Sequence, residues 1–221
     1  MPDSSFSIAD DDLTSAIAGA TAAHRRLLAT LEEVDDDTCR RPSRLPGWTI
    51  GHVLTHLARN ADSHVRMLEG AERGEALEQY AGGYDQRSAD IEAGAHRRAA
   101  DLVGDVCSSA SHLEQTWART EPEAWARHGL ARGRFWPCRH LPFHRWREVE
   151  LHHVDLGLGY EPGDWPEPYV ARELPLALAG LPERLPEEAR PWLLAWLVGR
   201  VGEPGPLPLD EWQTRPGRYF A

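Results

Sequence analysis

The sequence predicts a mainly α-helical protein, organised as a four-helix bundle with a small C-terminal extension. Apolar residues recur every three to four positions in four long segments, and no segment shows the alternation typical of a β-strand. Six of the 17 prolines fall in residues 1–160 and 11 fall in residues 161–221. Because proline ends or kinks helices, we expect the bundle in residues 1–160 and a proline-rich, partly helical region in residues 161–221.

The first half of the expected bundle contains two amphipathic helices. In the first, apolar residues recur at spacings of three and four between Leu13 and Leu31. A loop is expected over residues 35–46. The second helix begins after Thr49, because threonine is a good N-cap residue, and Gly70 is suited to end it.

The second half contains two further helices of the bundle. One is expected over residues 88–120, and a glycine-containing linker with room for a short hairpin follows it. The next begins at Pro142, because proline suits a first helical turn, and ends near Gly157. Two shorter helices are expected in the C-terminal region, at Tyr169–Leu181 and Glu187–Gly199.

Composition excludes several classes of protein. The net charge is −11 and no basic stripe stands out, so we expect neither nucleic acid nor an anionic membrane as a partner. No apolar run approaches the ~18 residues of a membrane span, and no signal pattern is present, so we expect a cytoplasmic protein. All 24 basic residues are arginine, which excludes lysine chemistry. The three cysteines form no CxxC pair, so a disulfide framework is not expected.

Two polar stripes predict a metal site inside the bundle. The second helix carries a polar residue at every fourth position, on one face: His52, His56, Asn60 and His64. On the fourth helix, Glu148 and His152 are one turn apart. One histidine of the second helix together with this pair supplies three ligands and leaves a position open, as in catalytic zinc sites.

The spacing has a second interpretation. In a chain with 11 histidines, pairs four residues apart also arise by chance. Spacing alone therefore favours histidines with structural or surface roles over metal ligands. It also leaves open which histidine of the second helix would be the first ligand.

Two segments carry a resemblance to a known family. The segments LPGWTIGHVLTHLARNAD (45–62) and REVELHHVDLGLGY (147–160) resemble the mycothiol-dependent maleylpyruvate isomerase family, which belongs to the DinB-like metal-binding four-helix bundles. The segments at 91–103 and 192–200 are similar as well, so the resemblance covers roughly residues 10–200. It implies a DinB-like bundle.

The resemblance implies a metal site and a mechanism. The implied ligands of Zn²⁺, or of another divalent metal, are His56, Glu148 and His152, with His52 as a second candidate for the first ligand. Mycothiol, as thiolate, adds to the cis double bond of maleylpyruvate, the resulting single bond rotates, and elimination gives fumarylpyruvate and returns the thiol. Two neutral histidines and one carboxylate leave a Zn²⁺ site with a net charge of +1, which favours a thiolate.

Three further residues have expected roles. Arg87 and Asn60 are the candidates for catalysis: Arg87 would bind the substrate carboxylates, and Asn60 would orient the thiol or the substrate. Asp155 would accept a hydrogen bond from a ligand histidine and so fix its tautomer. The expected partners are a small-molecule substrate and a low-molecular-weight thiol, in a monomer or homodimer.

Three alternatives remain open at this level. A mycothiol S-transferase would use the same metal site but join the thiol permanently to an electrophile. A non-catalytic, metal-stabilised binding bundle would need a fourth protein ligand, such as His52 or Asp155. A hydrolase would need a general base near the metal, and helix geometry points Glu150 away from that face.

Overall fold

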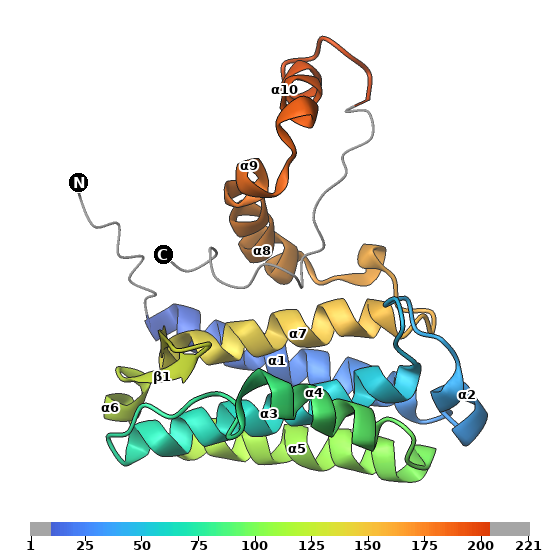
Figure 1. Ribbon diagram of the computed structural model, residues 1–221. Coiled ribbons are helices and arrows are strands. Elements are labelled where there is room, and N and C mark those ends of the chain that lie inside the picture. The colour runs from blue at the N-terminus through green and yellow to red at the C-terminus, as the bar shows by residue number, and fades with distance from the viewer. Residues whose placement is uncertain (1–9, 204–221) are drawn as a thin grey trace. The chain divides into compact units, whose positions relative to one another are not determined.

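The computed structural model describes residues 10–203 of the chain. Within this range the protein is mainly helical, with one two-stranded sheet (Figure 1). The chain divides into two units, Met1–Trp165 and Pro166–Ala221. No helix in the described part is long and apolar enough to cross a membrane. The predicted mainly α-helical fold class is confirmed.

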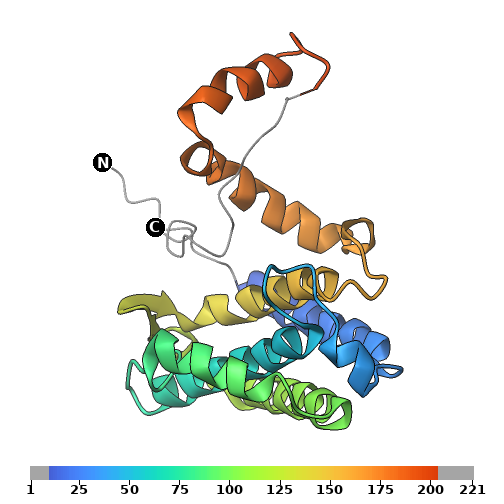
Figure 2. The same ribbon diagram turned by 45° about the vertical axis from the view of Figure 1, so that its right-hand side comes forward.

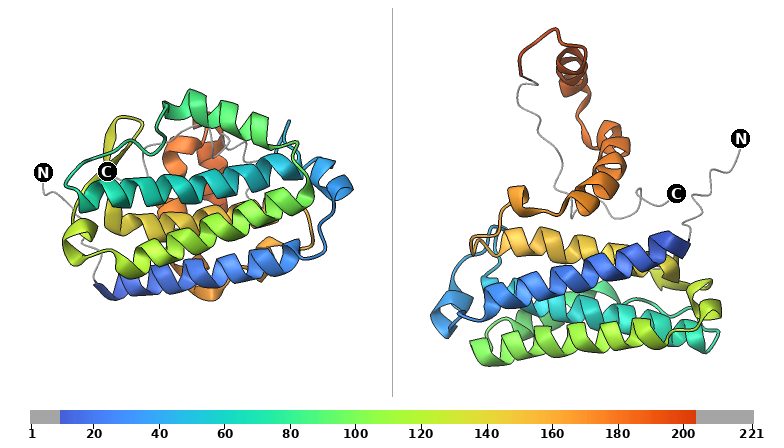
Figure 3. Two further views of the ribbon diagram at one scale, coloured as in Figure 1. Left: turned by 90° about the horizontal axis from the view of Figure 1, so that it is seen from below. Right: turned by 180° about the vertical axis from the view of Figure 1, so that it is seen from behind.

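Four long helices lie side by side in the first unit (Figure 3). They are α1 (Asp10–Leu31), α3 (Ile50–Glu72), α5 (Ala99–Arg119) and α7 (Leu141–Asp155). Helices α1 and α3 each pack against both α5 and α7, so the four helices enclose a common core. Buried apolar residues of all four helices build this core: Leu27, Leu31, Leu54, Leu57, Leu102, Leu113 and Val149.

Short elements connect the long helices or follow the last of them. They are α2 (Asp36–Arg40), α4 (Gly83–Gly94), α6 (Pro122–Trp125), β1 (His128–Ala131), β2 (Arg134–Pro137), η1 (Cys138–His140) and η2 (Pro162–Asp164). The two strands form an antiparallel hairpin in the predicted linker, with Ala131 opposite Arg134. Arg132 and Gly133 both have positive φ, as a tight two-residue hairpin turn requires.

Helix α3 begins where the sequence predicts. The Thr49 side chain accepts a hydrogen bond from the backbone N–H of His52, and the His52 imidazole accepts one from the backbone N–H of Thr49. The helix continues two residues past Gly70, because the chain turns at Gly74, which has a φ of 78°. A Cβ at Gly70 would lie 2.7 Å from the Leu77 side chain, so this glycine makes room for the returning chain.

The prediction of one helix over residues 88–120 is wrong. The segment is divided into α4 and α5, which are separated by residues 95–98. The Asp36 carboxylate accepts a hydrogen bond from the backbone N–H of Ala99 at 2.7 Å and so caps the start of α5. A Cβ at Gly51 would overlap the backbone oxygen of Ala95, so the break packs closely on α3. These long-range contacts decide the boundary.

The second unit is helical in its described part. It contains α8 (Glu167–Ala179), α9 (Leu181–Arg184), η3 (Glu187–Ala189) and α10 (Arg190–Leu197), drawn in orange and red in Figure 2. The predicted helices at 169–181 and 187–199 correspond to α8 and to η3 with α10. Residues 204–221 of the predicted C-terminal region and residues 1–9 of the predicted bundle lie outside the described residues.

Candidate metal centre

Three buried side chains from two helices converge inside the bundle. His56 lies on α3, and Glu148 and His152 lie one turn apart on α7. The Nε2 atom of His56 is 3.0 Å from Oε2 of Glu148 and 3.0 Å from Nε2 of His152. The Nε2 atom of His152 is 3.6 Å from the same carboxylate oxygen. The structure thus brings together the three residues that the sequence analysis singled out as metal ligands.

The donor atoms fit a divalent transition metal. A tetrahedral zinc ion with bonds of 2.0–2.1 Å places its ligand atoms about 3.3 Å apart, close to the three separations seen here. Two imidazole nitrogens and one carboxylate oxygen are donors that suit zinc and its neighbours better than magnesium or calcium. The three residues supply three ligands, which leaves a position for an outside molecule.

Electrostatics keep His56 neutral and Glu148 ionised. Burial, reinforced by the neighbouring His152, lowers the pKa of His56 to about 3. Burial opposes ionisation of Glu148, but hydrogen bonds with His152 and His56 hold its pKa well below the usual range. At neutral pH the centre therefore contains a neutral imidazole and a carboxylate.

His152 carries the proton of the metal-free centre. Burial lowers its pKa, but hydrogen bonds with Asp155 and Glu148 outweigh burial and raise that pKa to about 9. The Nδ1 atom of His152 lies 2.8 Å from Oδ2 of Asp155. Asp155 thus accepts the Nδ1 proton, as predicted, and leaves Nε2 as the atom that faces His56 and Glu148.

Arg87 lies beside the centre. It belongs to α4, is half-buried, and donates from Nη2 to the Nδ1 atom of His56 at 3.0 Å. Its guanidinium lies 5.7 Å from the centre of the Tyr80 ring, a distance at which a cation is attracted by the aromatic face. The chain thus places a permanent positive charge next to the three converging side chains.

Asn60 lies one turn further along α3 and contacts the core. It is buried, and its Oδ1 atom accepts a hydrogen bond from Nη1 of Arg145 at 2.7 Å. The fully buried Arg145 also donates to the backbone oxygen of Leu57 and to the ring of His24. The contact seen for Asn60 is therefore structural, and its role in orienting thiol or substrate stays a prediction.

His52 and Glu150 lie apart from the three converging side chains. His52 caps α3 and places its Nε2 atom 3.2 Å from Oε2 of Glu92, so it is His56 that meets the pair on α7. Glu150 is buried and accepts hydrogen bonds from Arg26, Trp146 and Tyr160. Its carboxylate is held by structural contacts, in agreement with the expectation that it points away.

His144 is a neighbour of the centre that the sequence analysis did not single out. Its Nε2 atom lies 3.7 Å from Oε1 of Glu148, and burial lowers the pKa of His144 to about 4. Its spacing could have indicated this position from the sequence. His144, Glu148 and His152 follow one another at intervals of four on α7, so they share one face of the helix.

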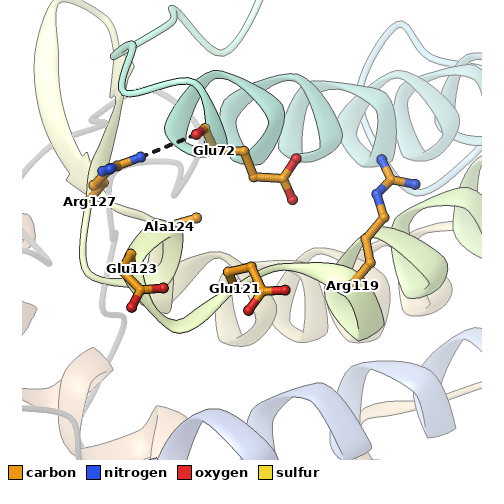
Figure 4. A pocket seen from close by; sticks show the side chains of 6 residues that line it. All are labelled: Glu72, Arg119, Glu121, Glu123, Ala124 and Arg127. Carbon is orange, nitrogen blue, oxygen red and sulfur yellow. Dashed lines mark hydrogen bonds between the residues drawn. The ribbon is translucent and has the colours of Figure 1, made fainter.

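A separate surface hollow lies between the C-terminal ends of α3 and α5 (Figure 4). Its lining is Glu72, Arg119, Glu121, Glu123, Ala124 and Arg127. The charged side chains there are exposed and of both signs, and the backbone oxygen of Glu72 accepts a hydrogen bond from Arg127. None of the three converging side chains lines this hollow, so it is separate from the candidate centre.

Comparison with known proteins identifies the family. Residues 20–157 match the family model of the mycothiol maleylpyruvate isomerase N-terminal domain. The chain belongs to this family. The matched range contains all three converging residues, and the match confirms the resemblance drawn from the segments at 45–62 and 147–160.

Solved structures of similar proteins support the same family fold. A crystal structure of the mycothiol-dependent maleylpyruvate isomerase is 29% identical, with a TM-score of 0.68. A mutant of that enzyme, with one histidine replaced by alanine, is 28% identical, also with a TM-score of 0.68. Each match covers 72% of this chain and 66% of the matched chain, so this chain spans just under two thirds of those enzymes. No curated protein matches the sequence.

Proposed function

We propose that the protein is a metal- and mycothiol-dependent isomerase. Its substrate would be maleylpyruvate, or a related cis-unsaturated oxo acid, and its product the corresponding fumaryl isomer. The observation that carries this proposal is the buried convergence of His56, Glu148 and His152 within 3.0–3.6 Å of one another. The family to which the chain belongs, and the similar enzymes, are named for this reaction.

The three residues would hold Zn²⁺ or another divalent metal. Such a metal favours the deprotonated form of a thiol that binds beside it. The thiol has to come from outside, because none of the three cysteines belongs to the converging cluster, and Cys39 and Cys138 are buried. Asp155 holds His152 through Nδ1, and α3 carries His56 to the same point, so both imidazoles present Nε2.

Arg87 would recognise the substrate. Maleylpyruvate carries two carboxylates, and its reaction develops further negative charge next to the double bond. In a chain without lysine, a half-buried arginine beside His56 is the residue suited to bind a carboxylate with two hydrogen bonds. The burial of the centre excludes bulk water and strengthens this attraction.

One assay separates isomerisation from the related thiol chemistry. The zinc-loaded protein is incubated with mycothiol and maleylpyruvate, and product and free thiol are both followed. We expect the fumaryl isomer to accumulate over many turnovers while the thiol concentration stays constant. Consumption of one thiol for each product would make the protein an S-transferase, and no turnover of either kind would support a binding bundle.

A further inference from the structure

A second set of metal-ligating side chains lies outside the centre described above. His52 is on α3, Glu92 is on α4, and His96 follows the end of α4. The Nε2 atom of His52 is 3.2 Å from Oε2 of Glu92, and the Nε2 atom of His96 is 3.6 Å from Oε1 of the same carboxylate. The three donor atoms all lie within 4.8 Å of one another.

This set repeats the donor pattern of the first centre. His52 precedes His56 by four residues, and Glu92 precedes His96 by four, as Glu148 precedes His152. In both sets one imidazole comes from α3 and a Glu-x3-His pair comes from a later segment. The two imidazole planes are nearly perpendicular in both, at 87° in the second set and 88° in the first.

The contacts with Thr49 fix the ring of His52. Its Nδ1 atom accepts a hydrogen bond from the backbone N–H of Thr49 at 3.1 Å and lies 2.7 Å from the hydroxyl oxygen of the same residue. The other ring nitrogen, Nε2, therefore faces Glu92. Metal-ligating histidines are normally oriented in this way by a contact at their second nitrogen.

The charge of the set is also that of a metal site. The hydrogen bond with His52 lowers the pKa of Glu92, so Glu92 is ionised at neutral pH. Two imidazoles and one carboxylate carry a net charge of −1 when both histidines are neutral. Imidazole donors favour zinc, nickel and copper ions, whereas magnesium and calcium favour sites made of oxygen alone.

We propose that His52, Glu92 and His96 form a second binding site for a divalent transition metal ion of the zinc class. It binds more weakly than the first centre, because the side chains of Glu92 and His96 are 72% and 69% exposed, whereas all three residues of the first centre are buried. The site does not depend on the isomerase activity, since its donors are separate from His56, Glu148 and His152.

Zinc titration tests the site. Protein that already holds one equivalent of Zn²⁺ is titrated with further Zn²⁺ by calorimetry. We expect a second binding event with a stoichiometry near one, and no such event with Mg²⁺. His96→Ala and Glu92→Gln should each weaken the second event at least tenfold. His112→Ala removes an exposed histidine of α5 outside both sets and should leave both events unchanged.

The outcomes separate the two sites. In His56→Ala the weaker event should persist, although the tight event is lost. A wild-type protein that shows only the weaker event, abolished by His96→Ala, would support the second site and count against the first. The second site is disproved if no second equivalent binds, or if His96→Ala and Glu92→Gln bind it as the wild type does.

Discussion

The Nε2 atoms of His56 and His152 lie 3.0 Å apart, although 96 residues separate the two histidines in the chain. Two imidazole nitrogens at this distance require a proton or a metal ion between them, because two lone pairs would repel each other. Asp155 accepts the Nδ1 proton of His152 and so leaves Nε2 of His152 for a metal. Arg87 donates to Nδ1 of His56, so a metal at Nε2 of His56 requires the ring proton to move to Nδ1 and this hydrogen bond to break.

Removing either ligand on α7 should release the metal. We expect His152→Ala and Glu148→Gln to weaken zinc binding at the tight site at least tenfold, because each removes one of three donors. Zinc content after dialysis and affinity against a coloured chelator are the measurements. His112→Ala serves as the control, and zinc content equal to wild type in both ligand variants would disprove the site.

Zinc affinity should rise with pH between pH 6 and pH 8. The raised pKa of His152, about 9, means that this residue is protonated in the metal-free protein below pH 9, and a metal must displace that proton. His56, with a pKa of about 3, and Glu148, with a strongly lowered pKa, are already deprotonated throughout this range. One proton therefore competes, and affinity should increase about tenfold per pH unit.

The variant Asp155→Asn tests the cause of this dependence. Loss of the Asp155 carboxylate removes the largest interaction that raises the pKa of His152. The pH dependence of zinc affinity should then become shallower near neutral pH. The measurement is the apparent affinity of both proteins at pH 6, 7 and 8, and a flat wild-type profile would contradict the protonation assigned to His152.

Substitution of Arg87 should affect the substrate more than the metal. We expect Arg87→Met to raise KM for maleylpyruvate at least tenfold, since a charge-assisted hydrogen bond contributes about 1.5–3 kcal/mol. Zinc content should stay that of the wild type, because Arg87 is not one of the three donors. Arg73→Met, which alters an exposed arginine paired with Glu75, is the matched control. An unchanged KM would remove Arg87 from substrate binding.

Asn60 offers a test between a structural and a catalytic role. Asn60→Leu leaves Nη1 of the buried Arg145 with the backbone oxygen of Leu57 and without the Asn60 oxygen. Because a buried donor loses a partner, the free energy of unfolding should fall by about 1–3 kcal/mol in urea denaturation. The kcat of the folded fraction should stay close to wild type. A lower kcat at unchanged stability would instead support the predicted catalytic role.

The local features of the fold were predictable from the sequence, and the long-range ones were not. The cap at Thr49 and the pairing of Glu148 with His152 depend on spacings of three and four residues, which a helix converts directly into neighbours. The break before Ala99 depends on Asp36, which lies 63 residues earlier and packs against it only in the folded chain. No local pattern signals such a contact.

The candidate site shows the same division. Spacing alone placed His52 and His56 on one face of α3. It left the choice between them open, because spacing within one helix does not show which other segment packs against each residue. In the folded protein Glu92 lies against His52, and Glu148 lies against His56. The choice of His56 over His52 as the first ligand therefore depends on how α4 and α7 pack on α3. In the sequence, only the resemblance to the family indicated this choice.

Two helical glycines should respond in opposite ways to alanine. A Cβ at Gly19 on α1 would overlap the indole ring of Trp146 on α7, whereas a Cβ at Gly104 on α5 meets no atom within 4 Å. Overpacking costs about 1–3 kcal/mol, which exceeds the gain in helix propensity of up to about 1 kcal/mol. In urea denaturation, Gly19→Ala should therefore destabilise the protein and Gly104→Ala should stabilise it by about 1 kcal/mol. Equal effects of the two substitutions would contradict the close packing of α1 on α7.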